Sequence, residues 1–243
     1  MGDNGAMSNP RRHSPAAVFG LLGLLFIGFG AGYLLSLRQN PEAPDTGIAV
    51  PAGLNLAVLT DARSLPAFRL QRHDGRPFTD DSLRGHWNVL FFGYTHCPDV
   101  CPLALQNLRY AWQQLQPDPS NPARPRAWFV SVDPDRDTPK LLGEYVTYFH
   151  PDFTGVTGPA DEIDKLTGAL GILYGFEDKT PGKDDYIVNH SSQMVFIDPQ
   201  GRMRAVLSPP YDGDDIVRAL RFLEARFGPQ ADNHITPKPE SLA

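Results

Sequence analysis

Cysteine is scarce in this chain of 243 residues, which contains only two, Cys97 and Cys101. Two cysteines exclude a small secreted scaffold held by several disulfides, and the lack of a second cysteine pair excludes a zinc ribbon. An excess of basic charge is also absent, because 22 Lys and Arg face 28 Asp and Glu. Since binding to a phosphate backbone needs a basic surface, no nucleic acid is expected as a partner.

The composition is otherwise ordinary, with 41% hydrophobic and 21% charged residues, which argues against wholesale disorder and against a polytopic membrane protein. We divide the chain into five parts by hydropathy and proline content. They are a cytoplasmic N-terminus 1–13, a transmembrane anchor 14–37, a linker 38–53, a folded domain 54–228 and a flexible tail 229–243. The residues after position 38 include 19 basic and 27 acidic side chains, so this part carries a net charge of −8.

The anchor is predicted from a long uncharged run. Residues 14–37 contain 24 residues without a charge, about 36 Å as a helix, whereas a hydrocarbon core measures about 30 Å. A cleavable signal peptide is the main alternative, but its apolar region is shorter and ends in a small-residue cleavage site that we do not find here. Arg11 and Arg12 precede the run and only Arg38 follows it closely, which favours a cytoplasmic N-terminus. We therefore expect a single-pass protein of the bacterial inner membrane with its C-terminal domain in the periplasm.

Strand and helix patterns alternate through the folded domain. Residues 87–94 (WNVLFFGY) and 127–132 (AWFVSV) are apolar runs typical of strands covered on both faces. Helical spacing follows each of them, and hairpins are predicted around Asp74-Gly75 and around residues 199–201. Further helices are predicted over 161–170 and 214–227. This order predicts a mixed α/β fold, a three-layer sandwich.

The chemistry is concentrated where the first buried strand meets its helix. Cys97 lies in the connecting loop and Cys101 in the first helical turn, with Asp99 as the predicted N-cap. Free N–H groups and the helix dipole at this position favour thiolates, so both cysteines are expected to have lowered pKa values. Such a pair can close a disulfide, or it can hold a soft metal with a third ligand from elsewhere.

Six histidines beyond the anchor are candidates for that third ligand. His73 lies beside a predicted turn, and His234 lies in the tail. His86 and His150 are expected to be solvated or to cap elements. His96 adjoins Cys97 but is expected to point away from it. His190, in a loop before a central strand, ranks only slightly above the others on its sequence context.

Three segments resemble the signature segments of the SCO/SenC family. They are GYTHCPDVCP (93–102), VSVDPDRDTP (130–139) and YIVNHSSQMVFIDPQGR (186–202). The resemblance covers about residues 65–227 and implies a thioredoxin-like fold with an added N-terminal hairpin, preceded by the transmembrane helix. It also implies copper binding through Cys97, Cys101 and His190, with Asp133 to Asp137 nearby. Tyr94 stands where many members carry phenylalanine.

The acidic segment allows one other reading. Asp133, Asp135, Asp137 and Glu144 match positions 1, 3, 5 and 12 of an EF-hand loop. Position 6, however, is Thr138 where such a loop requires glycine, and a strand precedes the segment where an EF-hand has a helix. An acidic loop that starts a helix is the better interpretation.

The leading hypothesis is a membrane-anchored copper chaperone that delivers copper, as Cu(I) or Cu(II), to the dinuclear copper centre of cytochrome c oxidase. The expected partners are the copper-centre subunit of the oxidase and other periplasmic copper chaperones or thioredoxin-like reductants. A thiol–disulfide reductase in which Cys97 and Cys101 are the catalytic pair is the alternative from the enzyme class, and a redox or copper sensor is a third. A dithiol at a helix N-terminus serves all three.

Overall fold

The computed structural model describes residues 48–228 apart from 117, 181 and 183. The predicted anchor 14–37, the tail 229–243 and most of the linker 38–53 lie outside these residues. Within the described part of the chain, no helix is both long and apolar enough to span a membrane. The first elements are the strands β1 (Leu56–Ser64), β2 (Arg69–Arg72) and β3 (Pro77–Thr79), the 3-10 helix η1 (Asp80–Leu83) and the strand β4 (Asn88–Gly93).

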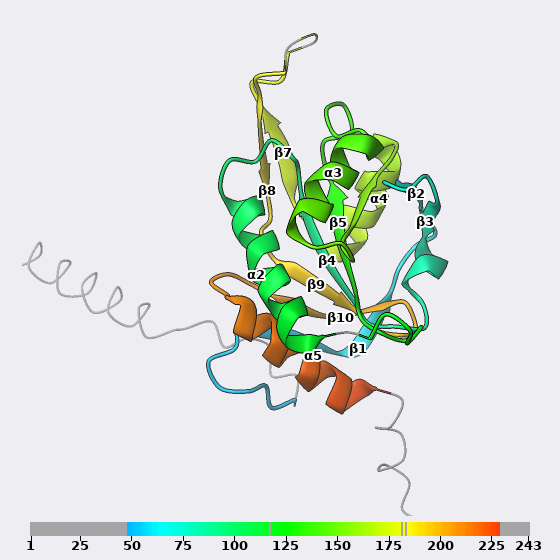
Figure 1. The fold of residues 1–243 in the computed structure, drawn as a ribbon, viewed down its shortest axis with the longest axis vertical. Helices are drawn as coiled ribbons and strands as arrows, with labels where there is room; N and C mark the ends of the chain where they lie inside the picture. The colour runs from blue at the N-terminus through cyan, green and yellow to red at the C-terminus, as the bar shows by residue number, and fades with distance from the viewer. Residues whose placement is uncertain (1–47, 117, 181, 183, 229–243) are drawn as a thin grey trace, which may run out of the picture. The chain divides into compact units, whose positions relative to one another are not determined.

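The rest of the domain alternates helices and strands before it closes with a hairpin and a helix (Figure 1). These elements are α2 (Val100–Leu115), β5 (Arg126–Ser131), α3 (Pro139–Phe149), β6 (Thr154–Thr157), α4 (Ala160–Leu170), β7 (Tyr174–Glu177), β8 (Ile187–His190), β9 (Met194–Ile197), β10 (Arg202–Leu207) and α5 (Gly213–Phe227).

An eight-stranded sheet in the order β1-β10-β9-β4-β5-β6-β2-β3 forms the centre of the domain. β4, β5 and β6 are parallel neighbours, whereas β9 pairs with β4 in the antiparallel sense. Every residue of β4 is buried, as its continuous apolar sequence predicts for a strand covered on both faces. The predicted mixed α/β fold is confirmed.

The connections β4–α2–β5 and β5–α3–β6 step across the sheet in the same direction. Because such crossovers are right-handed, α2 and α3 lie on one face of the sheet, in front of it in Figure 1. α5 packs beside α2, where the backbone of Gly213 approaches the ring of Tyr110 too closely for a side chain. α2 thus contacts both α5 and α3, and its buried residues belong to the hydrophobic core.

Both predicted hairpins are present, as β2–β3 around Asp74-Gly75 and as β9–β10. The sequence analysis missed β1, which pairs with β10 at one edge of the sheet, the short strand β6 between β5 and β2, and the separate two-stranded hairpin β7–β8. β1 has a register shift between Val58 and Arg63, and β7 is largely exposed. Neither strand therefore has the apolar alternation over its whole length that identifies a strand in a sequence.

Candidate metal centre

The two cysteines lie at the junction between β4 and α2. The backbone N–H of Cys97 donates to the carbonyl of Tyr94 at 3.2 Å, which closes a turn after the strand. Cys101 is the second residue of α2 and is fully buried, whereas Cys97 is 8% exposed. Asp99 occupies the N-cap position as predicted, although its side chain makes no capping hydrogen bond.

Gly93, the last residue of β4, makes room for the buried sulfur. A Cβ placed on Gly93 would overlap the Sγ of Cys101 and would lie 3.1 Å from the ring of Phe129. The absence of a side chain at position 93 therefore allows the first turn of α2 to approach the end of the central strand.

His190 completes the cluster from the end of β8, rather than from the loop that the sequence analysis expected. Its Nε2 lies 3.3 Å from the Sγ of Cys101. Its Nδ1 lies 3.1 Å from the carbonyl oxygen of Ser191. Because a carbonyl can only accept, Nδ1 carries the proton and the lone pair of Nε2 faces the sulfur.

Two aromatic rings hold the imidazole in place. The rings of Phe91 and Tyr94 meet the His190 ring edge-on, with centroids at 6.1 and 6.0 Å. The ligand atoms of Cys97, Cys101 and His190 all lie within 4.8 Å of one another, and they are the only such group of three among the described residues. The structure thus brings together the three side chains that the resemblance implies.

The two sulfurs differ in acidity. A hydrogen bond from the Cys101 thiol, with smaller contributions from backbone N–H groups, lowers the pKa of Cys97 to about 4, although burial opposes the shift. The same hydrogen bond to the Cys97 thiolate, together with burial, raises the pKa of Cys101. The prediction of two lowered pKa values is therefore wrong for Cys101, because a helix N-terminus cannot compensate for complete burial beside a second negative sulfur.

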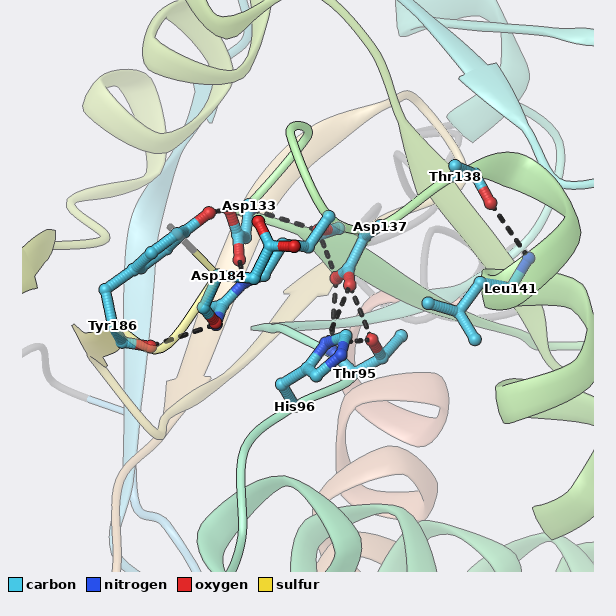
Figure 2. Close-up of polar contacts among 10 residues, drawn as sticks. Thr95, His96, Asp133, Asp137, Thr138, Leu141, Asp184 and Tyr186 are labelled. Atoms are coloured by element: carbon cyan, nitrogen blue, oxygen red, sulfur yellow. Dashed lines mark hydrogen bonds and ion pairs between the residues drawn. The ribbon is translucent and has the colours of Figure 1, made fainter. Parts of the chain in front are cut away.

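Asp137 ties the cysteine loop to the segment that follows β5 (Figure 2). Its carboxylate is fully buried and accepts hydrogen bonds from the backbone N–H of Thr95 at 3.0 Å and from the hydroxyl of Ser131 at 2.6 Å. The Thr95 hydroxyl donates to its other oxygen at 2.5 Å. Burial raises the pKa of Asp137. Since Thr95 lies two residues before Cys97, this carboxylate positions the loop that carries the more exposed sulfur.

Asp133 serves the histidine side of the site in a similar way. It is fully buried and accepts from the hydroxyl of Tyr186 at 2.6 Å and from Nε of Arg136 at 2.5 Å, as Figure 2 shows for Tyr186. Arg136 also donates to the carbonyls of Asp184 and Tyr186. These bonds hold the start of β8, four residues before His190.

Sequence reasoning placed Asp133 to Asp137 near the site but missed Thr95, Ser131 and Tyr186. Tyr186, Val188 and His190 follow the period of two of a strand, and this pattern was the available signal for Tyr186. The same contacts disfavour the calcium reading, because the oxygens of Asp133 and Asp137 are engaged with protein donors. Asp135 pairs with Lys179 at 2.8 Å instead. The segment is an acidic loop that starts a helix, with Thr138 capping α3 through the N–H of Leu141.

The other histidines among the described residues do not belong to the cluster. His96 is half-exposed and its Nδ1 lies 3.0 Å from the hydroxyl of Thr95, turned toward Asp137 in Figure 2. His150 accepts from the N–H of Asp152 at the end of α3, as a capping residue does. His86 is buried, so the expectation of a solvated side chain is wrong for this residue. His73 accepts from the N–H of Gly155, and His234 lies outside the described residues.

Two cysteines and a histidine beside a buried strand of a mixed α/β sheet define a candidate site for a soft metal. The chain belongs to the SCO1/SenC family, whose profile matches residues 58–223, and the fold is the thioredoxin-like fold of that family. An SCO2-like protein of Rickettsia prowazekii is 33% identical over 179 residues, which cover 73% of this chain and 82% of that protein.

Two further relatives are informative. The mitochondrial protein SCO2 of Saccharomyces cerevisiae is 34% identical over 154 residues, which cover 63% of this chain but only 50% of the yeast protein. The solved structure of Arabidopsis thaliana ScoI with copper bound has 31% sequence identity and a TM-score of 0.60. The similarity covers 67% of this chain and 98% of that one.

Proposed function

We propose that this protein is a membrane-anchored copper chaperone and that Cys97, Cys101 and His190 bind its copper cargo. The observation that carries the proposal is the convergence of two sulfurs and one imidazole nitrogen within 4.8 Å of one another. Ligand atoms that share one metal at bonds of about 2.0–2.3 Å lie about 3–4 Å apart, so small side-chain movements suffice to close the site. Thiolates select Cu(I), and the added imidazole suits copper in either oxidation state.

The proposed destination of the copper is the dinuclear copper centre of cytochrome c oxidase. Membership in the SCO1/SenC family supports this assignment. Two features of the site suit a donor rather than a storage protein. Cys97 keeps 8% of its surface exposed, through which a partner's ligand can approach the metal, and three protein ligands leave room for an incoming fourth.

Copper titration of single variants tests the ligand set. Cys97→Ala, Cys101→Ala and His190→Ala are each expected to abolish tight Cu(II) binding, because a three-ligand site loses one ligand. His96→Ala and His150→Ala are the matched controls and should bind normally, since neither ring belongs to the cluster. Cu(I) binding is expected to survive His190→Ala in weakened form, because two thiolates remain. A Cu(II)–thiolate charge-transfer band retained by His190→Ala would remove His190 from the site.

The proposed location is the periplasmic side of a bacterial inner membrane, supported by the uncharged run 14–37 and its arginine flanks. A reporter that is active only in the periplasm, fused after Ala243, is expected to be active. The same fusion to a reporter that is active only in the cytoplasm is the control. Activity of the cytoplasmic reporter alone would overturn the orientation.

A second candidate function, thiol–disulfide reduction of a partner, is favoured by the asymmetry of the cysteine pair. Cys97 is 8% exposed, whereas Cys101 is fully buried. The Cys97 thiolate would attack a partner disulfide and release one partner thiolate, and Cys101 would then attack Cys97 and release the other. Two electrons pass to the partner and the chain ends as a Cys97–Cys101 disulfide, which an external dithiol must reduce.

A further inference from the structure

A cavity of about 260 Å³ lies at the end of the sheet opposite to the cysteines. Arg126 begins β5 at this cavity, whereas the cysteines follow the C-terminal end of β4, the parallel neighbour of β5. Four arginines from two segments line it, and we name it the arginine pocket: Arg72 and Arg76 from the β2–β3 hairpin, and Arg124 and Arg126 from the loop before β5 and the first residue of β5. Nothing in the copper chemistry described above uses this end of the domain.

The carboxylates around the arginine pocket do not balance its charge. Asp74 contacts both Arg72, at 2.8 Å, and Arg76, at 3.1 Å. Asp152 makes a two-pronged contact with Arg124, at 2.7 and 3.4 Å. Within the part of the chain that the structure describes, no carboxylate oxygen lies within 4.0 Å of the Arg126 guanidinium. Four cations against two anions leave a local charge of about +2 in a part of the chain whose net charge is −8.

The arginines repel one another. Burial and then the neighbouring Arg72 and Arg124 lower the pKa of Arg126. Burial, with a further contribution from Arg76, lowers the pKa of Arg72 despite its contact with Asp74. The Nε of Arg72 is buried and has no hydrogen-bond partner among the described residues. A buried donor without a partner and several guanidinium groups close together are both costly in free energy. A bound anion would remove both costs, because it accepts hydrogen bonds and neutralises the positive charge.

We propose that the arginine pocket binds a phosphate group, either of a soluble phosphomonoester or of a phospholipid headgroup. The planar, forked guanidinium matches the oxygens of phosphate, and a phosphomonoester carries a charge of about −1.5 to −2 that matches the local excess. The cavity is large enough for one such group and its immediate substituent. The proposal is independent of copper binding, since the two sites lie at opposite ends of the strands.

Titration of inorganic phosphate into the full chain in a nonionic detergent, followed by calorimetry, tests the site. Binding is expected for the unaltered chain, and Arg126→Gln is expected to weaken it about tenfold or more by removing one charge-assisted contact. Arg221→Gln is the matched control, since Arg221 is exposed on α5 and the substitution removes the same charge. Equal phosphate affinity in Arg126→Gln and Arg221→Gln, or no phosphate binding by the unaltered chain, would overturn the proposal.

Arg76→Gln provides a second variant with little risk to folding, because the Arg76 side chain is 71% exposed. It too is expected to weaken phosphate binding relative to Arg221→Gln, and unchanged affinity would count against the pocket. Thermal unfolding and Cu(II) titration of the same preparations verify that each variant is folded and that the metal site is intact. Failure of phosphate binding with normal copper binding thus refutes this proposal alone.

Competition between two soluble ligands identifies the source of the phosphate group. Glycerol 3-phosphate presents a monoester, and dioctanoyl phosphatidylglycerol presents a lipid diester. Tighter binding of glycerol 3-phosphate, lost in Arg126→Gln, supports a soluble ligand. Tighter binding of the lipid, lost in the same variant, supports a membrane headgroup. Binding of either ligand that is unaffected by Arg126→Gln contradicts the site.

Discussion

The hydroxyl of Tyr186 donates a hydrogen bond of 2.6 Å to the buried carboxylate of Asp133, and this bond joins the acidic loop after β5 to the strand that presents His190. Arg136 lies over the Tyr186 ring at 3.6 Å and donates to Asp133 as well. Asp137, four residues further, fixes Thr95 in the cysteine loop. One short segment thereby positions both halves of a metal site whose halves are far apart in sequence.

Tyr186→Phe is expected to loosen the histidine half of the site. The substitution leaves Asp133 buried with one donor fewer, which costs about 1–3 kcal/mol of unfolding free energy. Because β8 loses its attachment four residues before His190, Cu(II) affinity should fall while Cu(I) affinity changes less. Urea unfolding and copper titration measure the two effects. Tyr148→Phe is the control, since Tyr148 is 82% exposed. Wild-type Cu(II) affinity in Tyr186→Phe would show that the tyrosine supports the fold without positioning the ligand.

Gly93→Ala is expected to damage the cysteine half. The added methyl group overlaps the Sγ of Cys101, so the first turn of α2 must move away from β4, at a cost of about 1–3 kcal/mol. Copper affinity should fall with stability, since one ligand is displaced. Gly168→Ala in α4 meets no atom within 4 Å and is expected to stabilise the protein by about 0.5–1 kcal/mol. If chemical denaturation shows Gly93→Ala to be as stable as Gly168→Ala, the close approach is not a constraint.

His86 is expected to make the protein less stable in mild acid. Burial, and then the nearby Arg126, lower the pKa of His86 from 6.5 to about 4. Between pH 4 and pH 6.5 the His86 imidazole is therefore protonated in the unfolded chain and neutral in the folded chain. The contribution of the neutral imidazole is complete above pH 6.5 and is lost as the pH falls toward 4, by about 3 kcal/mol in total at 1.36 kcal/mol per pKa unit.

Unfolding free energies at pH 7 and pH 4.5, compared between the unaltered chain and His86→Gln, measure this effect. Glutamine does not titrate, so the variant should lose less stability between the two pH values, by about 2 kcal/mol. Parallel pH profiles for the two proteins would show that His86 is not the responsible group.

His190→Ala discriminates between copper delivery and thiol reduction. A reductase needs the two cysteines to exchange with a partner, and the imidazole is not necessary for that exchange. A copper donor needs all three ligands. When copper is scarce, His190→Ala is expected to impair assembly of the oxidase copper centre about as severely as Cys97→Ala, while the cysteine pair is still oxidised and reduced.

The assay compares oxidase activity in cells that carry each variant under copper limitation, with His150→Ala as the matched control. Low copper is essential, because abundant copper can load the oxidase without a donor. Normal assembly with His190→Ala but not with Cys97→Ala would favour the reductase over the chaperone.

The sequence alone predicted those features of this protein that depend on residues close together along the chain. The apolar run that became β4, the helix that follows it and the five-residue span of the two cysteines all depend on neighbours along the chain. For that reason the strand–turn–helix junction and the closeness of the sulfurs could be predicted from periodicity and capping residues. Thr138, which caps α3, and Pro139 in its first turn are local signals of the same kind.

The tertiary structure decided which distant groups meet, and how strongly each is buried. His190 reaches Cys101 across 89 residues because β8 is inserted between α4 and the central strand β9, an arrangement that residue spacing does not specify. The raised pKa of Cys101 opposed the expectation from its place in the helix, since burial depends on what packs over the sulfur. Likewise, the four arginines of the pocket belong to segments that only the strand order brings together. Spacing along the chain determines contacts within a turn or two, whereas contacts between distant segments, and the desolvation they impose, depend on the completed packing of the sheet and its helices.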